Sequence, residues 1–313
     1  MRPSKRFWQR AVRWAFWGLF SVIRRVPWTP ALAWATGTGT LAYHLSGRYR
    51  RVAEKNLLRA YGDSLTAGER QRLTKRVFQH FARALLVEFF KGADFTLDEM
   101  RRRVTTGPEG YAAMDALLAR GKGAIVVSAH LGNWEWLCKR AVMDGFDVKV
   151  VARQSEDAEF NALTDRVRGT NGYSVHPRGD SPRALLRQLK ENKIVAIVPD
   201  QKSEDVFVPF FGHLAGTVAG PAVLALKTGA AILPMFCPRQ PDGTYRTVFY
   251  PAILPVSTGD QEEDVRRIMA EITLDIEDIV RQYPDQWLWL HDRWRVPPPP
   301  GLSAHAPTAA AAG

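Results

Sequence analysis

The chain has 313 residues, of which 46% are hydrophobic and 11% aromatic. This content can bury a sizeable core, which excludes a disordered chain. The formal net charge of +11 lies at one end, because residues 1–53 carry ten Lys and Arg and no Asp or Glu. A protein that reads nucleic acid over its whole surface would spread its charge more widely, so we expect no nucleic-acid partner. The two cysteines, Cys138 and Cys237, have no metal or redox spacing, and we expect reduced thiols.

Residues 1–47 mix arginines with large apolar side chains and predict a membrane-anchoring segment. The first apolar run, 11–23, contains an arginine and is followed by Arg24 and Arg25, which argues against a cleaved signal peptide. Residues 26–45 are uncharged and about long enough to cross a bilayer, but they include two prolines and two glycines. Three arrangements remain open: interfacial attachment to anionic lipids, which we favour, a single membrane span, and a soluble helical hairpin.

From residue 48 onward the pattern is first helical and then alternates between strands and helices. Apolar positions at three- and four-residue spacing predict helices within 48–95, and 107–121 predicts another. Short apolar, mostly β-branched runs predict strands at 123–129, 148–152, 193–198, 231–236 and 247–252. Further helices are expected at 134–143, 158–169, 182–191 and 261–282.

This alternation predicts an α/β fold, in which helices flank a mixed, mainly parallel sheet. We assign residues 48–296 to that domain. Residues 297–313 are rich in Pro and Ala and contain no core-forming pattern, so we expect a flexible tail.

The stretch SAHLGNWEW, residues 128–136, directly follows a predicted buried strand. His130 and Glu135 cannot meet on one regular element, because five positions differ by about 140° on a helix and point to opposite faces of a strand. They can meet if His130 ends the strand, Gly132 turns the chain, and Asn133 caps a helix that carries Glu135. A carboxylate that bonds one imidazole nitrogen supports proton uptake by the other. The spacing alone leaves two interpretations open, a catalytic pair and a capped polar turn.

Other classes of enzyme find little support in the sequence. The chain has no GxSxG elbow for a serine hydrolase, and Ser128 lies too near His130 for a triad. Its seven histidines are scattered and form no HExxH motif, so we expect no metal site. It contains no Walker loop and no GxGxxG.

Six separated stretches together resemble the bacterial lipid A biosynthesis acyltransferases, the late lauroyl- or myristoyl-transferring enzymes of the lysophospholipid acyltransferase-like superfamily. The resemblance extends over about residues 5–296. It rests on HLGNWE (130–135), RVRGTNG (166–172), VPDQ (198–201), VPFFG (208–212) followed by Thr217, TGAAILPMF (228–236) and YPDQWLWLHDRWR (283–295).

The resemblance implies a glycerolipid-acyltransferase-like fold at the cytoplasmic face of the inner membrane. The acyl donor would be an acyl carrier protein thioester, or less favourably acyl-CoA, with no other cofactor. The acceptor would be a hydroxyl of a lipid A precursor, and His130 would be the general base with Glu135 as its partner. Alternatives are another glycolipid or aminolipid acceptor, such as a phosphatidylinositol mannoside, and a non-catalytic lipid-binding protein.

The same motifs place functional polar residues at Arg168 and Asp200. We expect Arg168 to contact acceptor phosphate or the oxyanion and Asp200 to order the site; the alternatives are a surface charge and a strand-end turn. Arg153, at another strand end, and Asn133 complete the expected substrate-binding set.

The tryptophans of these motifs have two interpretations. Trp134 and Trp136 either belong to the core, which we favour, or line an acyl channel. Trp287, Trp289 and Trp294 either pack the C-terminal segment onto the sheet, which we favour, or touch lipid.

Overall fold

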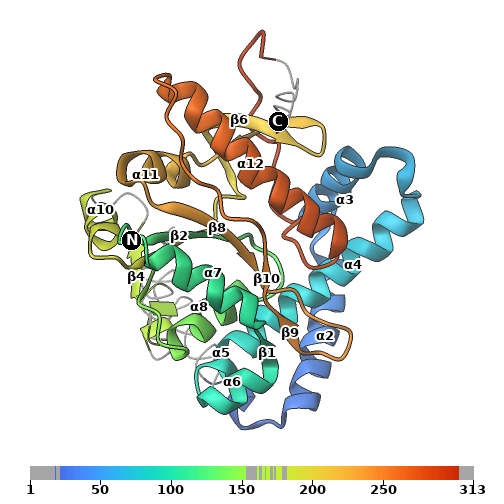
Figure 1. Cartoon of the computed structure of the whole chain (residues 1–313). Coiled ribbons are helices and arrows are strands. Elements are labelled where there is room, and N and C mark those ends of the chain that lie inside the picture. The colour runs from blue at the N-terminus through green and yellow to red at the C-terminus, as the bar shows by residue number, and fades with distance from the viewer. Residues whose placement is uncertain are drawn as a thin grey trace, which may run out of the picture.

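The computed structural model describes Gly18, residues 22–152 and 182–302, and several positions between those two ranges (161, 164, 165, 167–169, 172 and 174–177). Six strands form the central sheet in the order β10-β8-β2-β5-β3-β4 (Figure 1). Their bounds are β2 Ala124–Val127, β3 Val148–Ala152, β4 Ser174–Pro177, β5 Ile194–Ile197, β8 Ala231–Phe236 and β10 Val248–Phe249. Strands β8 to β4 pair in parallel, and β10 runs antiparallel to β8 at one edge. The predicted mixed, mainly parallel sheet is confirmed.

Alternate residues of the central strands enter two separate cores. Ile125 and Val127 of β2 belong to one core, and Ala124 and Val126 belong to the other. The first core lies under α10 (Pro182–Lys190), α11 (Gly220–Thr228) and α12 (Gln261–Gln282), and the second under α6 (Leu97–Arg103), α7 (Pro108–Leu118) and α8 (Trp134–Met143) (Figure 1). Helices therefore cover both faces of the sheet, as expected for strands without a polar face.

The N-terminal helices pack beside this sheet. They are α2 (Trp28–Leu45), α3 (Gly47–Tyr61), a 3₁₀ turn (Gly62–Ser64) and α4 (Ala67–Arg83), which continues through a π-helical turn (Ala84–Glu88) into α5 (Phe89–Gly92). Helix α2 lies along α4 so closely that a Cβ on Gly39 would stand 2.7 Å from the Cα of Gln79. None of the helices built from described residues is both long and apolar enough to span a membrane.

Several short elements escaped sequence prediction. They are the edge strand β4, the hairpin β6 (Lys202–Phe210) and β7 (His213–Thr217), the parallel pair β1 (Val104–Thr105) and β9 (Tyr245–Arg246), and helices α6 and α11. Within the predicted helix 158–169, the described positions 161, 164, 165 and 167–169 are helical, and the predicted tail lies outside the described residues from 303 onward.

The C-terminal segment packs through its tryptophans. Trp287, Trp289 and Trp294 are 1%, 0% and 5% exposed and belong to the first core. The packing interpretation of these residues is confirmed, and the segment becomes part of the surroundings of the candidate site.

Candidate active site

A strand, a tight turn and a helix build the site from consecutive residues. The fully buried strand β2 ends at Val127, and α8 begins at Trp134. Between them Gly132 has φ +62°, and a Cβ there would lie 2.1 Å from the carbonyl oxygen of Cys237, so the turn requires glycine. The side chain of Asn133 caps α8 by accepting the Trp136 N–H at 3.0 Å. The strand–turn–helix arrangement predicted for this stretch is confirmed, with Asn133 as the cap.

The register of the sheet brings His130 to Asp200. Val127 of β2 pairs with Ile197 of β5 in parallel, and His130 and Asp200 each follow three residues later. The two side chains meet at the carboxyl edge of the sheet, where sites of open α/β folds lie. His130 Nδ1 is 2.7 Å from Asp200 Oδ1, and the His130 backbone N–H donates to Oδ2 at 2.8 Å.

The ionisation of Asp200 fixes the tautomer of His130. Burial raises the pKa of Asp200, but the charge of His130 and the hydrogen bonds from His130 and Trp287 outweigh it, so the pKa lies below its usual range. An ionised carboxylate only accepts hydrogen bonds, so Nδ1 carries the proton and donates it to Asp200. Nε2 is then an acceptor, 3.4 Å from the amide nitrogen of Gln201. The His130 side chain remains 21% exposed.

Asp200 also makes His130 a better base. Burial lowers the pKa of His130, but the charge and hydrogen bond of Asp200, together with the charge of Glu135, outweigh that effect and raise the pKa above 6.5. The imidazolium that forms on proton uptake is thereby stabilised.

Glu135 has a different neighbour from the one expected. Its carboxylate accepts two hydrogen bonds from the guanidinium of Arg168, with Nη2–Oε1 at 2.6 Å and Nε–Oε2 at 3.2 Å. The carboxylate that bonds Nδ1 of His130 is Asp200, where the sequence predicted Glu135. The physical reason is the sheet register, which places Asp200 level with His130, whereas Glu135 lies in the first turn of α8. Glu135 acts on His130 through its charge.

Of the remaining predicted residues, Trp136 is 2% exposed and belongs to the second core. Trp134 is partly buried against the first core, and its ring lies 5.1 Å from the His130 ring. Arg153 lies outside the described residues. Trp287 was expected either to pack, which was favoured, or to touch lipid; besides packing, its Nε1–H donates to Asp200 Oδ2 at 2.8 Å.

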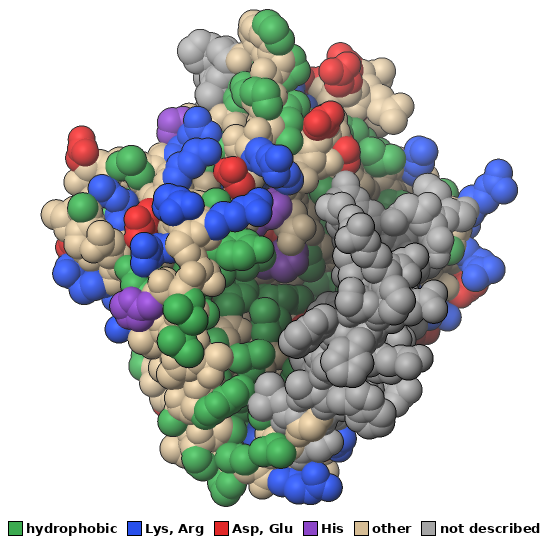
Figure 2. Space-filling view, turned by 180° about the vertical axis from the view of Figure 1, so that it is seen from behind, with side chains coloured by type: hydrophobic (Ala, Val, Ile, Leu, Met, Phe, Trp, Pro, Cys, Tyr) green, Lys and Arg blue, Asp and Glu red, His purple; other side chains and the backbone are tan. Residues whose placement is uncertain are grey.

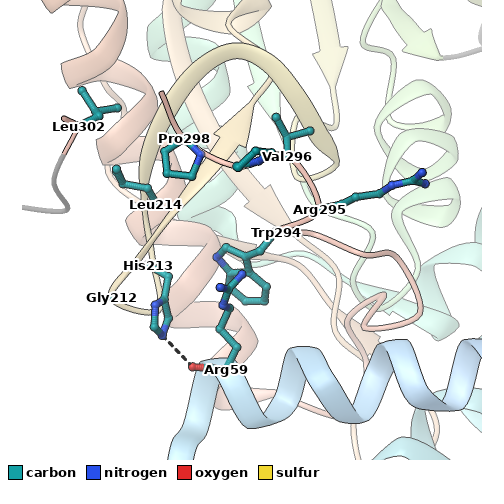
Figure 3. A pocket seen from close by; sticks show the side chains of 10 residues that line it. Arg59, Gly212, His213, Leu214, Trp294, Arg295, Val296, Pro298 and Leu302 are labelled. Carbon is teal, nitrogen blue, oxygen red and sulfur yellow. Dashed lines mark hydrogen bonds between the residues drawn. The ribbon is translucent and has the colours of Figure 1, made fainter. Parts of the chain in front are cut away.

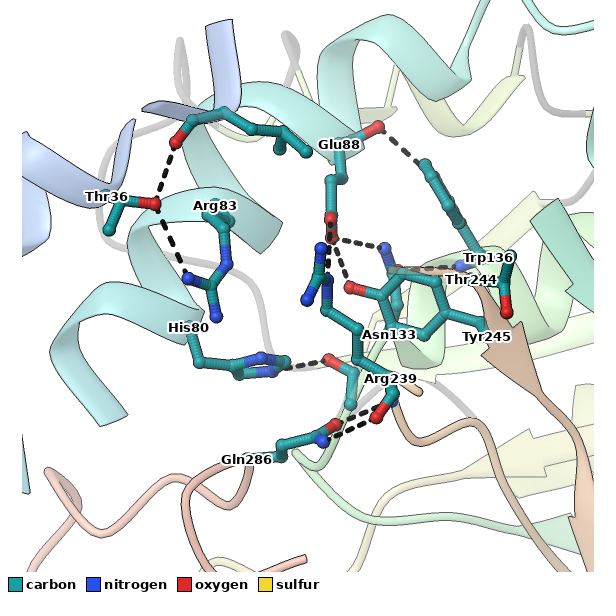
Figure 4. A network of polar contacts seen from close by, with 12 residues as sticks. Thr36, His80, Arg83, Glu88, Asn133, Trp136, Arg239, Thr244, Tyr245 and Gln286 are labelled. Atoms are coloured by element: carbon teal, nitrogen blue, oxygen red, sulfur yellow. Dashed lines mark hydrogen bonds and ion pairs between the residues drawn. The ribbon is translucent and has the colours of Figure 1, made fainter. Parts of the chain in front are cut away.

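The buried carboxyl residue Glu88 forms hydrogen bonds with residues at the start of α8 (Figure 4). Glu88, in the π-helical turn, is fully buried, and its Oε2 accepts from Tyr245 Oη at 2.5 Å and Asn133 Nδ2 at 3.2 Å. Its main-chain oxygen accepts the Trp136 indole N–H at 3.1 Å. The second carboxylate oxygen is 4.0 Å from Nε of Arg239. Burial raises the pKa of Glu88. No sequence signal identified Glu88, since it lies on a helix far from the motif.

The turn itself is fixed by distant segments. His80 donates from Nε2 to the Gly132 carbonyl at 3.0 Å, and burial lowers the pKa of His80 to about 3, so the ring is neutral. The Gly132 N–H donates to the Gln286 carbonyl at 3.1 Å, and the Leu288 N–H donates to the His130 carbonyl at 3.1 Å. These contacts determine where the imidazole stands.

Figure 2 shows that one face of the molecule is hollowed by a groove with a largely hydrophobic floor. Histidine side chains lie at one end of this groove, and Lys and Arg side chains gather above that end (Figure 2).

A separate cavity of about 470 Å³ is lined by Arg59, His213, Trp294 and the C-terminal segment (Figure 3). His213 Nε2 bonds the Arg59 carbonyl at 3.1 Å there. Trp294 stacks on Phe210, which contacts Trp287, so these rings stand between the cavity and Asp200.

The site is a partly exposed imidazole that a buried carboxylate orients at the carboxyl edge of a mainly parallel sheet, the edge where active sites of α/β enzymes lie. The chain belongs to the family of bacterial lipid A biosynthesis acyltransferases, whose profile matches residues 1–296. It is therefore an acyltransferase, and the resemblance drawn from its motifs is confirmed.

Curated relatives cover nearly the whole chain. A phosphatidylinositol mannoside acyltransferase of Mycobacterium tuberculosis (strain ATCC 25618 / H37Rv) is 28% identical over 307 residues, covering 93% of this chain and 91% of the relative. The lipid A biosynthesis lauroyltransferase of Escherichia coli (strain K12) is 23% identical over 298 residues, covering 94% and 93%. The lipid A biosynthesis palmitoleoyltransferase of the same strain is 24% identical over 297 residues, with the same coverage.

Proposed function

We propose that the chain transfers an acyl group from an acyl carrier protein thioester to a hydroxyl of a lipid A precursor of the Kdo-lipid IVA type. The observation that carries this proposal is the His130–Asp200 pair, which leaves Nε2 as an acceptor on a partly exposed ring. An apolar groove on the molecule suits an acyl chain (Figure 2).

In the proposed reaction, Nε2 of His130 takes the proton of the acceptor hydroxyl while its oxygen attacks the thioester carbonyl carbon. The tetrahedral intermediate then expels the thiolate, which takes the proton from His130, so that an ester and a free thiol result. Arg168 is the proposed contact for the acceptor phosphate or the oxyanion, because its guanidinium is held by Glu135 near His130 and keeps 19% of its side chain exposed. Its charge would stabilise either anion.

A phosphatidylinositol mannoside is the second candidate acceptor. The relative of that name is 28% identical to this chain, against 23% for the lauroyltransferase, so sequence similarity does not favour the lipid A precursor.

Membrane attachment is part of the proposal. Helix α2 exposes Trp34, Leu41 and Leu45, which are 42%, 58% and 74% exposed and recur on one side of the helix. Interfacial attachment to anionic lipid at the inner, cytoplasmic membrane face would cover these side chains and use the basic N-terminal residues.

The test uses purified full chain, a carrier protein loaded with a saturated acyl chain, and each acceptor in turn. We expect an ester product with one acceptor class and a loss of about 10²–10⁴-fold in kcat for His130→Ala. Equal turnover by the variant would contradict the assignment of His130 as the base. Mass spectrometry of the product identifies the acceptor and the acylated hydroxyl.

A further inference from the structure

Helix α3 presents a row of positive charge to solvent. Arg48, Arg51, Lys55 and Arg59 recur at intervals of three or four residues, so they share one side of the helix, and all four are exposed. The row is roughly 16 Å long at the helical rise per residue. Ala53 and Leu57 of α3 are buried against the rest of the domain, while Tyr49 and Leu58 are 53% and 49% exposed. This basic row is therefore a surface feature of a helix whose other side is already packed.

The basic row has few counter-charges. Within the described part of the chain, Arg48, Arg51 and Arg59 form no ion pair. Lys55 Nζ lies 3.6 Å from Asp292 Oδ1, and the Lys55 side chain remains 61% exposed. The acidic residue of the helix, Glu54, is half-buried. Like charges three or four residues apart repel each other on a helix, so an acidic partner would be attracted here.

The basic row lies beside the segment that anchors the catalytic pair. Lys55 reaches Asp292, and the Arg59 guanidinium lies 5.8 Å from the Trp294 ring centroid. From the buried side of α3, Asn56 donates to the carbonyls of Trp289 and His291 at 2.9 and 2.7 Å. The same segment supplies Trp287, which bonds Asp200. A partner bound to the row would therefore adjoin the segment that holds Asp200.

We infer that the basic row of α3 docks the acidic carrier protein that delivers the acyl thioester. The inference rests on the proposed function, since it names the surface through which that donor is recognised. A carrier whose thioester hangs on a flexible prosthetic arm can bind at this helix while the reacting carbon reaches the site. Complementary charge of this kind speeds encounter and fixes the partner's orientation.

An acidic protein fits this surface better than a lipid bilayer does. A helix that binds lipid needs a large apolar face beside its charges. In α3, Ala53 and Leu57 are buried in the protein, and the exposed Tyr49 and Leu58, nine positions apart, lie on opposite sides of the helix and form no continuous apolar face. The exposed apolar side chains on one side of α2 provide a surface for lipid instead. The two helices thus offer different chemistry to two partners.

The experiment compares two donors on the full chain. One donor is the carrier protein loaded with a saturated acyl chain, and the other is the same chain on pantetheine, which lacks the protein. The test variant is Arg51→Glu/Lys55→Glu, and the control variant is Lys227→Glu/Arg246→Glu, which reverses two exposed charges elsewhere. We expect the KM for the carrier-borne donor to rise about tenfold or more in the test variant only, with kcat and the pantetheine kinetics unchanged. In wild type, the same KM should rise with ionic strength.

Other outcomes would overturn the inference. An equal change with both donors, or no change with either, would show that the row does not dock the carrier. Loss of binding to anionic vesicles with unchanged carrier kinetics would assign the row to lipid. Binding of the unloaded carrier protein is measured in parallel, because it does not require turnover. If wild type transfers no acyl group, the proposed function fails, and carrier binding that the test variant loses still supports the docking surface. Absence of that binding in wild type contradicts the surface itself.

Discussion

At the scale of single residues, His130 and Asp200 work as one unit. The carboxylate accepts Nδ1–H, the His130 backbone N–H and the Trp287 indole N–H, so it is held against the ring from three directions. A carboxylate so placed keeps the correct tautomer and orientation and stabilises the imidazolium. The ability of His130 to act as a base therefore depends on Asp200 as well as on the exposure of its own ring.

Replacing Asp200 with Asn should change both the rate and its pH dependence. The pKa of His130 is raised mainly by Asp200 against the effect of burial, so the wild-type rate should increase with pH through a pKa above 6.5. In Asp200→Asn the burial of His130 is no longer offset by that charge, so its pKa should fall. The rising part of the pH–rate profile should then lie at lower pH. The plateau rate should fall about 10²–10⁴-fold. Profiles of kcat/KM against pH test this, and an unmoved limb would show that Asp200 does not set the pKa.

Glu135→Gln tests whether Glu135 is a direct partner of the base. The structure pairs Glu135 with Arg168, so we expect a loss of only about ten- to a hundredfold in kcat/KM, smaller than that of Asp200→Asn. The double variant with Arg168→Ala should lose less than the product of the two single losses, because the two side chains act together. A loss from Glu135→Gln that exceeds that of Asp200→Asn would restore the His130–Glu135 pairing.

At the scale of elements, the sequence predicted the buried strands and the strand–turn–helix at His130 because both leave local patterns. Runs such as AIVV (124–127) are wholly apolar, and Gly132 and Asn133 have conformational roles of their own. The β6–β7 hairpin was missed because Pro209 interrupts β6 and the exposure of that strand does not alternate.

The partner of His130 could not be predicted for a different reason. It depends on β2 and β5 being neighbours in register, and strand order is a property of the whole sheet. Asp200 was recognised as a functional residue by its motif, yet its position opposite Nδ1 required the topology. Glu88 left no signal, because its role arises where a π-helical turn meets α8.

Glu88→Gln should loosen the start of α8. The amide that replaces the carboxylate cannot satisfy Tyr245, Asn133 and Arg239 together, since part of it becomes a donor. We expect about 1–3 kcal/mol lower free energy of unfolding and a fall in kcat. Chemical denaturation and steady-state kinetics measure both quantities. Glu204→Gln, at an exposed position of β6, is the matched control and should change neither. Wild-type stability in Glu88→Gln would contradict a supporting role for this carboxylate.

At the scale of the whole molecule, α2 both packs against the rest of the domain and exposes apolar side chains to solvent. Ala31, Ala35 and Gly39 are buried, while a neighbouring side of the helix exposes apolar side chains. Removal of residues 1–46 would therefore strip a packed helix from α4 as well as any lipid contact. Surface substitutions separate these two effects.

The substitutions Trp34→Ser, Leu41→Ser and Leu45→Ser in the full chain should reduce binding to anionic vesicles more than tenfold, because burial of large apolar side chains drives insertion. Flotation with vesicles of phosphatidylglycerol and phosphatidylethanolamine measures the bound fraction. Leu254→Ser/Val256→Ser removes exposed apolar groups from another region and should leave binding unchanged. Undiminished flotation of the α2 variant would show that α2 makes no lipid contact.

The hydrogen bonds that fix the turn at Gly132 have a consequence for biosynthesis. Gly132 and His130 are bonded to Gln286 and Leu288, near the other end of the domain in sequence. During translation, the imidazole is made long before the residues that lock it in place have left the ribosome. Contacts between such distant parts of a chain form late in folding. The helices and strands that precede this segment in the sequence can therefore form first. His130 takes its final position only when synthesis is almost complete.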